Sequence, residues 1–151
     1  MNNLGAMLRD QAELQKALDG RAFDTDPTTT CEYIKDMTLA AMDELHELLG
    51  EVGWKPWATS KHVHVDEARG EWIDAWHFMM NLANTLGMTE DMIVEMYYAK
   101  AHINKKRMLQ GYDGVSTKCP NCKRALDDPV TNCYRAENGQ GVWCDQVMAW
   151  V

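Results

Sequence analysis

A chain of 151 residues, 46% of them hydrophobic, is long enough to bury the core of one domain of ordinary size. Its formal net charge of −8 argues against a duplex nucleic-acid binder, which needs Lys and Arg clustered over a broad face. No apolar run approaches the roughly 20 residues of a membrane-spanning helix, and the N-terminal residues lack the order of a signal peptide. We therefore expect an intracellular globular protein with no membrane partner. Nucleic acid is not an expected partner either.

Apolar residues at helical spacing predict a first helix over Leu4–Leu18. A connector rich in turn-forming residues follows, and its end offers a capping box with Thr29 as N-cap and Glu32 as partner. The second helix is expected from about Cys31 to about Gly50. Pro56 disfavours helix at the preceding residue, which makes the next segment a loop.

A third helix is predicted over Val65–Leu86, with Gly87 placed to end it in a left-handed conformation. Trp72 and Trp76 on this helix are expected in the core. A fourth helix, capped by Thr89, should end near residue 110. The helical pattern predicts an all-α domain over residues 1–115.

Two of the predicted helices carry acidic side chains along one face. These acids are Glu44, Glu47 and Glu51 on the second helix and Glu67, Glu71 and Asp74 on the third. Residues three, four and seven apart share a helix face, and antiparallel helices would bring the pair Glu44/Glu47 opposite the pair Glu71/Asp74. Such a cluster repels itself unless cations occupy it, and hard ions such as Mg²⁺ take oxygen ligands. The alternative is two ordinary solvated faces.

The fourth helix carries a stripe of a different kind. Lys100, Asn104 and Arg107 stand at offsets of four and seven, and Tyr112 follows the helix. Cations that hold phosphate, opposite acids that hold metal, would make a coherent site for phosphate chemistry. A salt-bridged bundle would show the same charges without a reason for Asn104 to lie in line.

Residues 116–151 form a separate module with four cysteines and short apolar pieces that suggest short strands. Cys119 and Cys122 form a C-x-x-C pair, which has the spacing of a zinc knuckle, and Cys133 and Cys144 can close a tetrahedral site. We expect a structural Zn²⁺ in a zinc-ribbon-like fold, because a tail this short has little core of its own. Free thiols or disulfides are the alternative.

The paired acids, E-x-x-E followed by E-x-x-D, resemble those of the all-α nucleoside triphosphate pyrophosphatase superfamily, with its MazG-type and dimeric dUTPase members. The resemblance is closer to the dimeric dUTPase branch. It is carried by "WKPW" at residues 54–57, "DAWHF" at 74–78 and "KAHINKKRMLQGY" at 100–112, and it covers about residues 4–118. This resemblance implies a four-helix MazG/dUTPase-like bundle.

It also implies hydrolysis of a deoxynucleoside triphosphate, with dUTP favoured, between the α and β phosphorus atoms to the monophosphate and pyrophosphate. Glu44, Glu47, Glu71 and Asp74 would hold Mg²⁺, for which Mn²⁺ could substitute. Glu47, or else Glu44, would orient the attacking water. The resemblance further implies an oligomer, dimer or tetramer, because short four-helix units of the MazG type complete one another's sites.

The resemblance assigns substrate contacts to a further set of side chains. These are Lys100, Arg107, Tyr112 and Lys118 for the phosphates, Asn104 for the nucleoside, Lys55 with Trp54 or Trp57 for the pocket wall, and Gln15 near the base. Asp19 stands where the family tends to have Asn. An ionised carboxylate only accepts hydrogen bonds, so the base stays open, and a MazG-like enzyme acting on dCTP, dGTP or several nucleotides is the alternative. A non-catalytic helical adaptor with a zinc ribbon is the alternative of another class.

Overall fold

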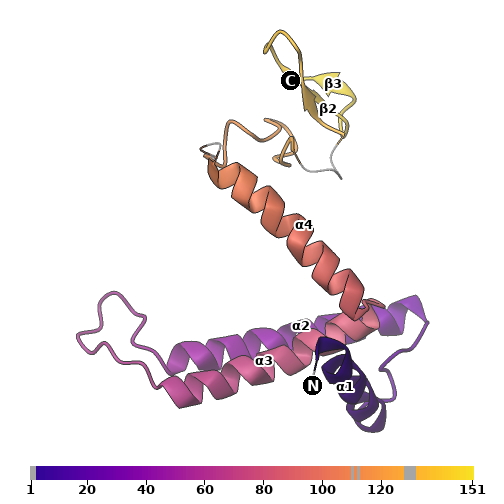
Figure 1. Cartoon of the computed structure of the whole chain (residues 1–151), viewed down its shortest axis with the longest axis vertical. Coiled ribbons are helices and arrows are strands. Elements are labelled where there is room, and N and C mark those ends of the chain that lie inside the picture. Colours follow the sequence, from indigo (N-terminus) through magenta and orange to yellow (C-terminus); the bar gives the residue numbers. More distant parts are fainter. Residues whose placement is uncertain (1–2, 110, 112, 128–131) are drawn as a thin grey trace. The chain divides into compact units, whose positions relative to one another are not determined.

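A computed structural model describes residues 3–109, 111, 113–127 and 132–151 of the chain. Its helices are α1 (Leu4–Leu18), α2 (Pro27–Gly50), α3 (Val65–Thr85) and α4 (Glu90–Leu109). Its strands are β1 (Tyr134–Arg135), β2 (Val142–Cys144) and β3 (Ala149–Trp150), which form one antiparallel sheet in the order β1-β2-β3 (Figure 1). Helices followed by a small sheet confirm the predicted fold class.

The chain forms two compact units, Met1–Met96 and Tyr97–Val151. The predicted module of residues 116–151 lies within the second. In the described part of the chain, no helix has both the length and the apolar character needed to cross a membrane.

α1 has the extent that its apolar spacing predicts. Asn3 is the N-cap, and its Oδ1 accepts a hydrogen bond from the backbone N–H of Ala6 at 2.9 Å. The helix ends at Leu18, and Asp19 adopts an extended conformation.

The predicted cap of the second helix is wrong. Asp26 is the N-cap in place of Thr29, and its Oδ2 accepts from the Thr29 N–H at 2.9 Å and from the Thr29 hydroxyl at 3.1 Å. Pro27 takes the first helical position, where its missing N–H removes a donor that has no helical partner. α2 therefore begins before the expected Cys31.

The junction between α3 and α4 forms as predicted. Gly87 has a φ of 66°, the left-handed conformation that a side chain would disfavour, and it follows the end of α3. Thr89 then caps α4, because its Oγ1 accepts from the backbone N–H of Met92 at 3.2 Å.

α2 and α3 lie side by side at the centre of the first unit (Figure 1). α1 packs against α3. The buried apolar residues of this unit are Leu8 of α1, Tyr33, Met37 and Ala41 of α2, and Ala75 and Met80 of α3. Small and flexible side chains at this contact allow the two long helices to approach closely.

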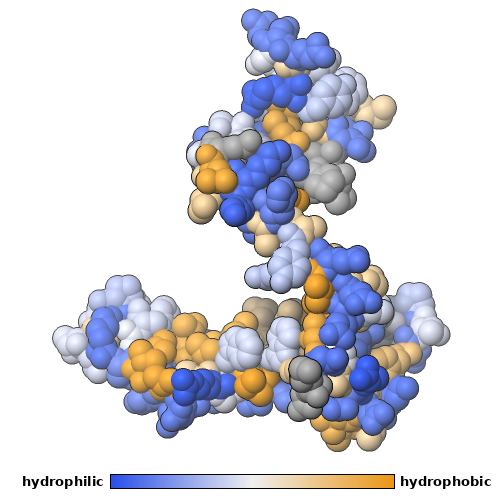
Figure 2. Space-filling view, viewed as in Figure 1, coloured by the Kyte–Doolittle hydropathy of each residue, from blue (hydrophilic) through white to orange (hydrophobic). Residues whose placement is uncertain are grey.

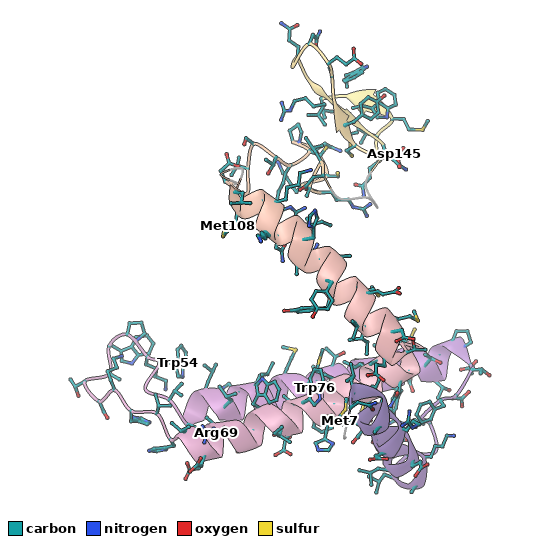
Figure 3. All side chains as sticks on the ribbon, in the orientation of Figure 1. Met7, Trp54, Arg69, Trp76, Met108 and Asp145 are labelled. Carbon is teal, nitrogen blue, oxygen red and sulfur yellow. The ribbon has the colours of Figure 1, made fainter. Side chains whose placement is uncertain are left out.

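The loop between α2 and α3 is tied at its base by an antiparallel bridge between Val52 and Val63. Gly53 is required there because a Cβ would lie only 2.8 Å from the backbone oxygen of Ser60. Trp54 follows at once, and Figure 3 shows it on this loop.

The expectation of a core position is wrong for Trp72. Its side chain is 53% exposed, and it stacks on Trp76 with ring centroids 6.0 Å apart. Trp72 borders a shallow hollow of about 630 Å³, whose apolar walls come from Leu48, Val63, Val65, Ala68 and Ile73. We call these six residues the apolar hairpin face. Figure 2 shows hydrophobic residues gathered at the surface of this unit.

The second unit has cysteines where an ordinary domain has an apolar core. Cys119, Cys133, Val142 and Cys144 are its buried cluster, with Cys122 and Leu126 packed against them. β2 contributes two of these residues from alternate positions on one face of the sheet.

Candidate functional site

The paired acids of α2 and α3 converge. Glu44 and Glu47 of α2 and Glu71 of α3 each place a carboxylate oxygen within 4.8 Å of the other two. Glu44 and Glu71 are half-buried, whereas Glu47 is exposed. The spacing of three residues puts both α2 acids on one helix face, and the α2–α3 packing brings Glu71 opposite them.

The raised pKa of Glu44 reflects its burial and the negative charge of the neighbouring carboxylates. Burial raises the pKa of Glu44, and the charges of Glu47, Asp74 and Glu71 raise it further, as does a hydrogen bond with Glu71. Three oxygen donors that repel one another fit a hard divalent cation such as Mg²⁺, which would replace that repulsion with attraction.

Asp74 stands one helical turn beyond Glu71 and is exposed. It is not one of the three converging acids, although its charge acts on Glu44. The outer acids take other roles. Glu51 forms the C-cap of α2 and accepts a hydrogen bond from His64 Nδ1 at 2.9 Å, and Glu67 is exposed in the first turn of α3.

A buried network of amides links α1 to α3. Asn81 is 3% exposed, its Oδ1 accepts from Gln11 Nε2 at 2.9 Å, and its Nδ2 donates to Gln15 Oε1 at 3.1 Å. His77 Nδ1 donates to Gln11 Oε1 at 2.6 Å. Gln15, a predicted substrate residue, is therefore buried and fixed in orientation.

Sequence reasoning missed Gln11 and Asn81, although a signal was present. Gln11 lies four residues before Gln15, and Asn81 lies seven after Asp74, so each shares a helix face with a predicted site residue. Seven residues of helix span about 10 Å, which places Asn81 along α3 from the acids.

Asp19 is engaged by a cation. Its carboxylate accepts from Arg21 Nη2 at 2.9 Å and Nε at 3.2 Å, and from the Arg21 backbone N–H at 2.9 Å. These bonds lower the pKa of Asp19. Arg21 also donates to Asp36 at 2.8 Å and lies over the Tyr33 ring, with 5.9 Å to its centroid. The guanidinium thus joins the α1–α2 connector to α2 and occupies both oxygens of Asp19.

Two of the residues expected in the pocket wall, Trp54 and Lys55, border one hollow. A hollow of about 330 Å³ at the C-terminal end of α2 is lined by Trp54, Lys55 and His46, among others. Trp57 is 76% exposed and does not line this hollow.

The remaining predicted substrate residues belong to the second unit. Lys100 and Asn104 are exposed on α4, and Lys118 is half-buried. Arg107 donates to Asp127 with a closest distance of 2.6 Å. Tyr112 lies outside the described residues. Their contacts with substrate stay a prediction.

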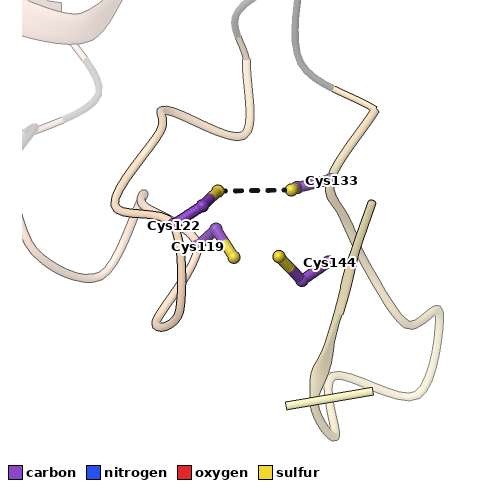
Figure 4. Close-up of side chains that lie close together, drawn as sticks. All are labelled: Cys119, Cys122, Cys133 and Cys144. Atoms are coloured by element: carbon purple, nitrogen blue, oxygen red, sulfur yellow. Dashed lines mark hydrogen bonds between the residues drawn. The ribbon is translucent and has the colours of Figure 1, made fainter. Parts of the chain in front are cut away.

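The four cysteines of the tail form one cluster, with sulfur atoms within 4.8 Å of one another (Figure 4). The sulfur atoms of Cys122 and Cys133 are 3.5 Å apart. Zn–S bonds of about 2.3 Å in a tetrahedron separate sulfurs by about 3.8 Å, so the donor set fits a metal of this kind. Asn121 Nδ2 donates to Cys144 Sγ at 3.3 Å, and this bond, with further hydrogen bonds from Cys119 and the backbone N–H groups of Gln146 and Val147, lowers the pKa of Cys144 to about 6.

The crowding of Glu44 predicts a stability effect. The folded-state pKa of Glu44 lies above its unfolded value, so ionised Glu44 reduces the free energy of unfolding at neutral pH. This cost disappears as the pH falls through the raised pKa. Without divalent metal, Glu44→Gln should therefore have a higher Tm than the wild type near pH 7, and the difference should shrink toward the unfolded pKa of about 4.3.

Thermal unfolding followed by circular dichroism at several pH values measures this difference. Glu13→Gln, at an exposed position of α1, is the matched control and should leave Tm nearly unchanged. A Glu44→Gln protein less stable than the wild type at neutral pH would contradict the repulsion.

Comparison with known proteins bears on this site. The family model described as dUTPase matches residues 3–90, which is more than half of the chain and includes the converging acids and the amide network. Neither the comparison with curated proteins nor that with solved structures gave a match. The chain belongs to the dUTPase family.

Proposed function

We propose that the protein hydrolyses a deoxynucleoside triphosphate, with dUTP favoured, between the α and β phosphorus atoms, releasing the monophosphate and pyrophosphate. The convergence of Glu44, Glu47 and Glu71 within 4.8 Å carries this proposal. Membership of the dUTPase family supports it.

The residues of the cluster suit different roles. Glu44 and Glu71 are half-buried and would hold Mg²⁺ together with Asp74. Bound Mg²⁺ would neutralise charge on the phosphate oxygens and make a bound water a better nucleophile. Glu47 is the exposed member of the three, so its carboxylate can accept the proton of an attacking water that arrives from solvent.

The amide network supports recognition of a base near α1. Because Asn81 and His77 fix the carbonyl oxygens of Gln15 and Gln11, the donor and acceptor ends of these amides cannot exchange freely. Asp19 has both oxygens bound by Arg21, which leaves it less available to a base than the amide it replaces. A free carboxylate was the feature that favoured dCTP or dGTP.

The proposal predicts the outcome of a substrate panel. With Mg²⁺ and each common deoxynucleoside triphosphate in turn, the protein should release pyrophosphate, fastest from dUTP. Glu47→Gln should lower the rate by at least about 100-fold, because it removes a general base without changing size. Glu67→Gln, on an exposed acid of α3 outside the cluster, is the control and should keep the wild-type rate.

Circular dichroism must show that Glu47→Gln is folded. Release of orthophosphate alone, absence of turnover with every nucleotide, or a fully active Glu47→Gln protein would each refute the proposal. A preference for dCTP or dGTP would agree with the proposed reaction but would refute the proposed specificity for uracil.

We also propose that the protein acts as a homo-oligomer whose subunits pack through the apolar hairpin face. Trp72 and Ile73 are 53% and 45% exposed there, and monomeric proteins seldom leave a large apolar patch in water. A second copy offers an equally apolar surface, and a two-fold contact would cover both patches at once.

Light scattering tests this proposal. The wild type should have at least twice the 17.2 kDa mass of one chain, and Trp72→Arg should shift it toward the monomer because a charge would be desolvated at the contact. Leu14→Arg, on an exposed residue of α1, is the control and should keep the wild-type mass. A monomeric wild type would contradict the proposal.

We propose, finally, that the metal of the four-cysteine cluster is a structural Zn²⁺. Purified protein kept under reducing conditions should contain about one zinc per chain by elemental analysis. Cys144→Ser should lose this zinc and make the tail sensitive to protease. Cys31→Ser should retain it, because Cys31 is exposed and lies outside the cluster. Zinc-free wild type, or equal zinc in the Cys144→Ser protein, would contradict the site.

A further inference from the structure

Three aromatic residues are aligned across the sheet of the second unit. Tyr134 of β1 pairs with Trp143 of β2, which pairs with Trp150 of β3. Residues directly opposite one another in an antiparallel sheet project from the same face. The neighbours of Trp143 on β2, Val142 and Cys144, are buried among the cysteines, so the aromatic residues occupy the other face.

The three rings form a corner. Tyr134 and Trp143 are nearly parallel, at 25° with centroids 6.4 Å apart. The Trp150 ring stands across both, at 86° to Tyr134 and 74° to Trp143, with centroids 5.7 Å and 5.8 Å away. Tyr134 and Trp150 are 54% and 53% exposed. The rings thus contact one another and still present faces and edges to solvent. We call these three residues the aromatic corner.

The core of the module does not account for this face. Its buried cluster consists of the cysteines and Val142 on the opposite side of the sheet. Two aromatic side chains more than half exposed would stabilise the module little by burial. An exposed aromatic group of this size is typical of a binding surface.

Cations lie near the aromatic corner, around the edge strand β1. Arg135 pairs with Val142, so it projects from the face opposite the rings. It borders a hollow of about 630 Å³ with Tyr134, Trp150 and Glu137, and a second hollow of about 590 Å³ with Lys118 and Lys123. Arg135 donates to the neutral backbone oxygen of Ser116 at 2.7 Å. Among the residues that the structure describes, none of these three cations forms an ion pair.

The charge of the chain is divided unequally between the two units. Residues 97–151 contain eight Lys and Arg against five Asp and Glu, a formal charge of +3, whereas residues 1–96 contain seven against 18, a formal charge of −11. The chain-wide charge of −8 therefore describes the first unit and conceals a basic second one. Such asymmetry is typical of chains that bind a polyanion through one part.

We propose that the second unit binds single-stranded nucleic acid, with bases stacked on the aromatic corner and phosphates held by Arg135, Lys118 and Lys123. Stacking on aromatic rings beside cations is how proteins bind single strands without reading sequence. In a duplex each base is stacked between its neighbours, so no base face is free to stack on the aromatic corner. The two hollows share Arg135, so the cations follow the rings around the edge strand β1, which favours a strand over one nucleotide.

Fluorescence anisotropy of the full-length protein, with a labelled oligothymidylate of about 12 nucleotides and no Mg²⁺, tests this proposal. The wild type should bind at low salt and release the strand as salt rises. Tyr134→Leu and Trp150→Leu should each weaken binding at least about fivefold, the lower end of the effect of losing one stacked base. Arg135→Gln should weaken binding and reduce its salt dependence.

Tyr98→Leu is the matched control, because Tyr98 is also exposed in the second unit but lies on α4. It should bind like the wild type. All variants should keep the metal content and the nucleotide turnover of the wild type, so this test is separate from that of the proposed activity. No binding by the wild type, equal binding of a duplex, competition by equimolar thymidine monophosphate, or an undiminished Tyr134→Leu protein would each overturn the proposal.

Discussion

The repulsion among carboxylates held between α2 and α3 is the constraint on which the first unit depends. Ala41 and Ala75 are buried at the contact between these helices, and each lies within one turn of the acids on its own helix. Small side chains at a helix contact let the backbones approach, and that approach brings Glu44 and Glu71 together. The packing that stabilises the hairpin therefore also creates a repulsion that a divalent cation would relieve. Because net stability is only about 5–15 kcal/mol, binding of such a cation would measurably stabilise this unit.

Further along α3, the charged contact with α2 gives way to a neutral, buried contact with α1. Asn81 donates to Gln15 and accepts from Gln11, so each amide satisfies its neighbour and none is left as a buried group without a partner. Directional bonds of this kind define one arrangement of donors and acceptors, which an apolar contact could not do. α3 therefore carries both groups, because it faces the acids of α2 through Glu71 and the amides of α1 through Asn81. Under the proposed function, the charged group would suit metal and phosphate and the amide group a base.

Local signals predicted what local interactions decide. The ends of α1 and α3 follow from periodicity and from Gly87, and the acid pairs follow from helical spacing. The start of α2 was missed because two N-cap signals overlap in the sequence. Asp26 caps the helix with Pro27 in the first helical position, and the backbone N–H of Thr29 donates to the Asp26 carboxylate. The amide network was missed because Gln11 and Asn81 are far apart in sequence, and only the α1–α3 packing joins them. The exposure of Trp72 was missed because helical spacing shows which residues share a face but not which other element packs against that face.

The second unit differs from the first in what it buries: the first buries apolar side chains of its helices, whereas the second buries cysteines and exposes aromatic rings. Its buried cluster consists of three cysteines and Val142, so thiols stand where a domain usually has an apolar core, whereas Tyr134 and Trp150 are more than half exposed. If the proposed zinc is bound there, it would supply the cohesion that Tyr134 and Trp150 would otherwise have to provide. A short chain stabilised in this way could carry an exposed aromatic surface and keep its fold. The acidic unit thus concentrates like charges between two helices, whereas the basic unit exposes aromatic rings near cations.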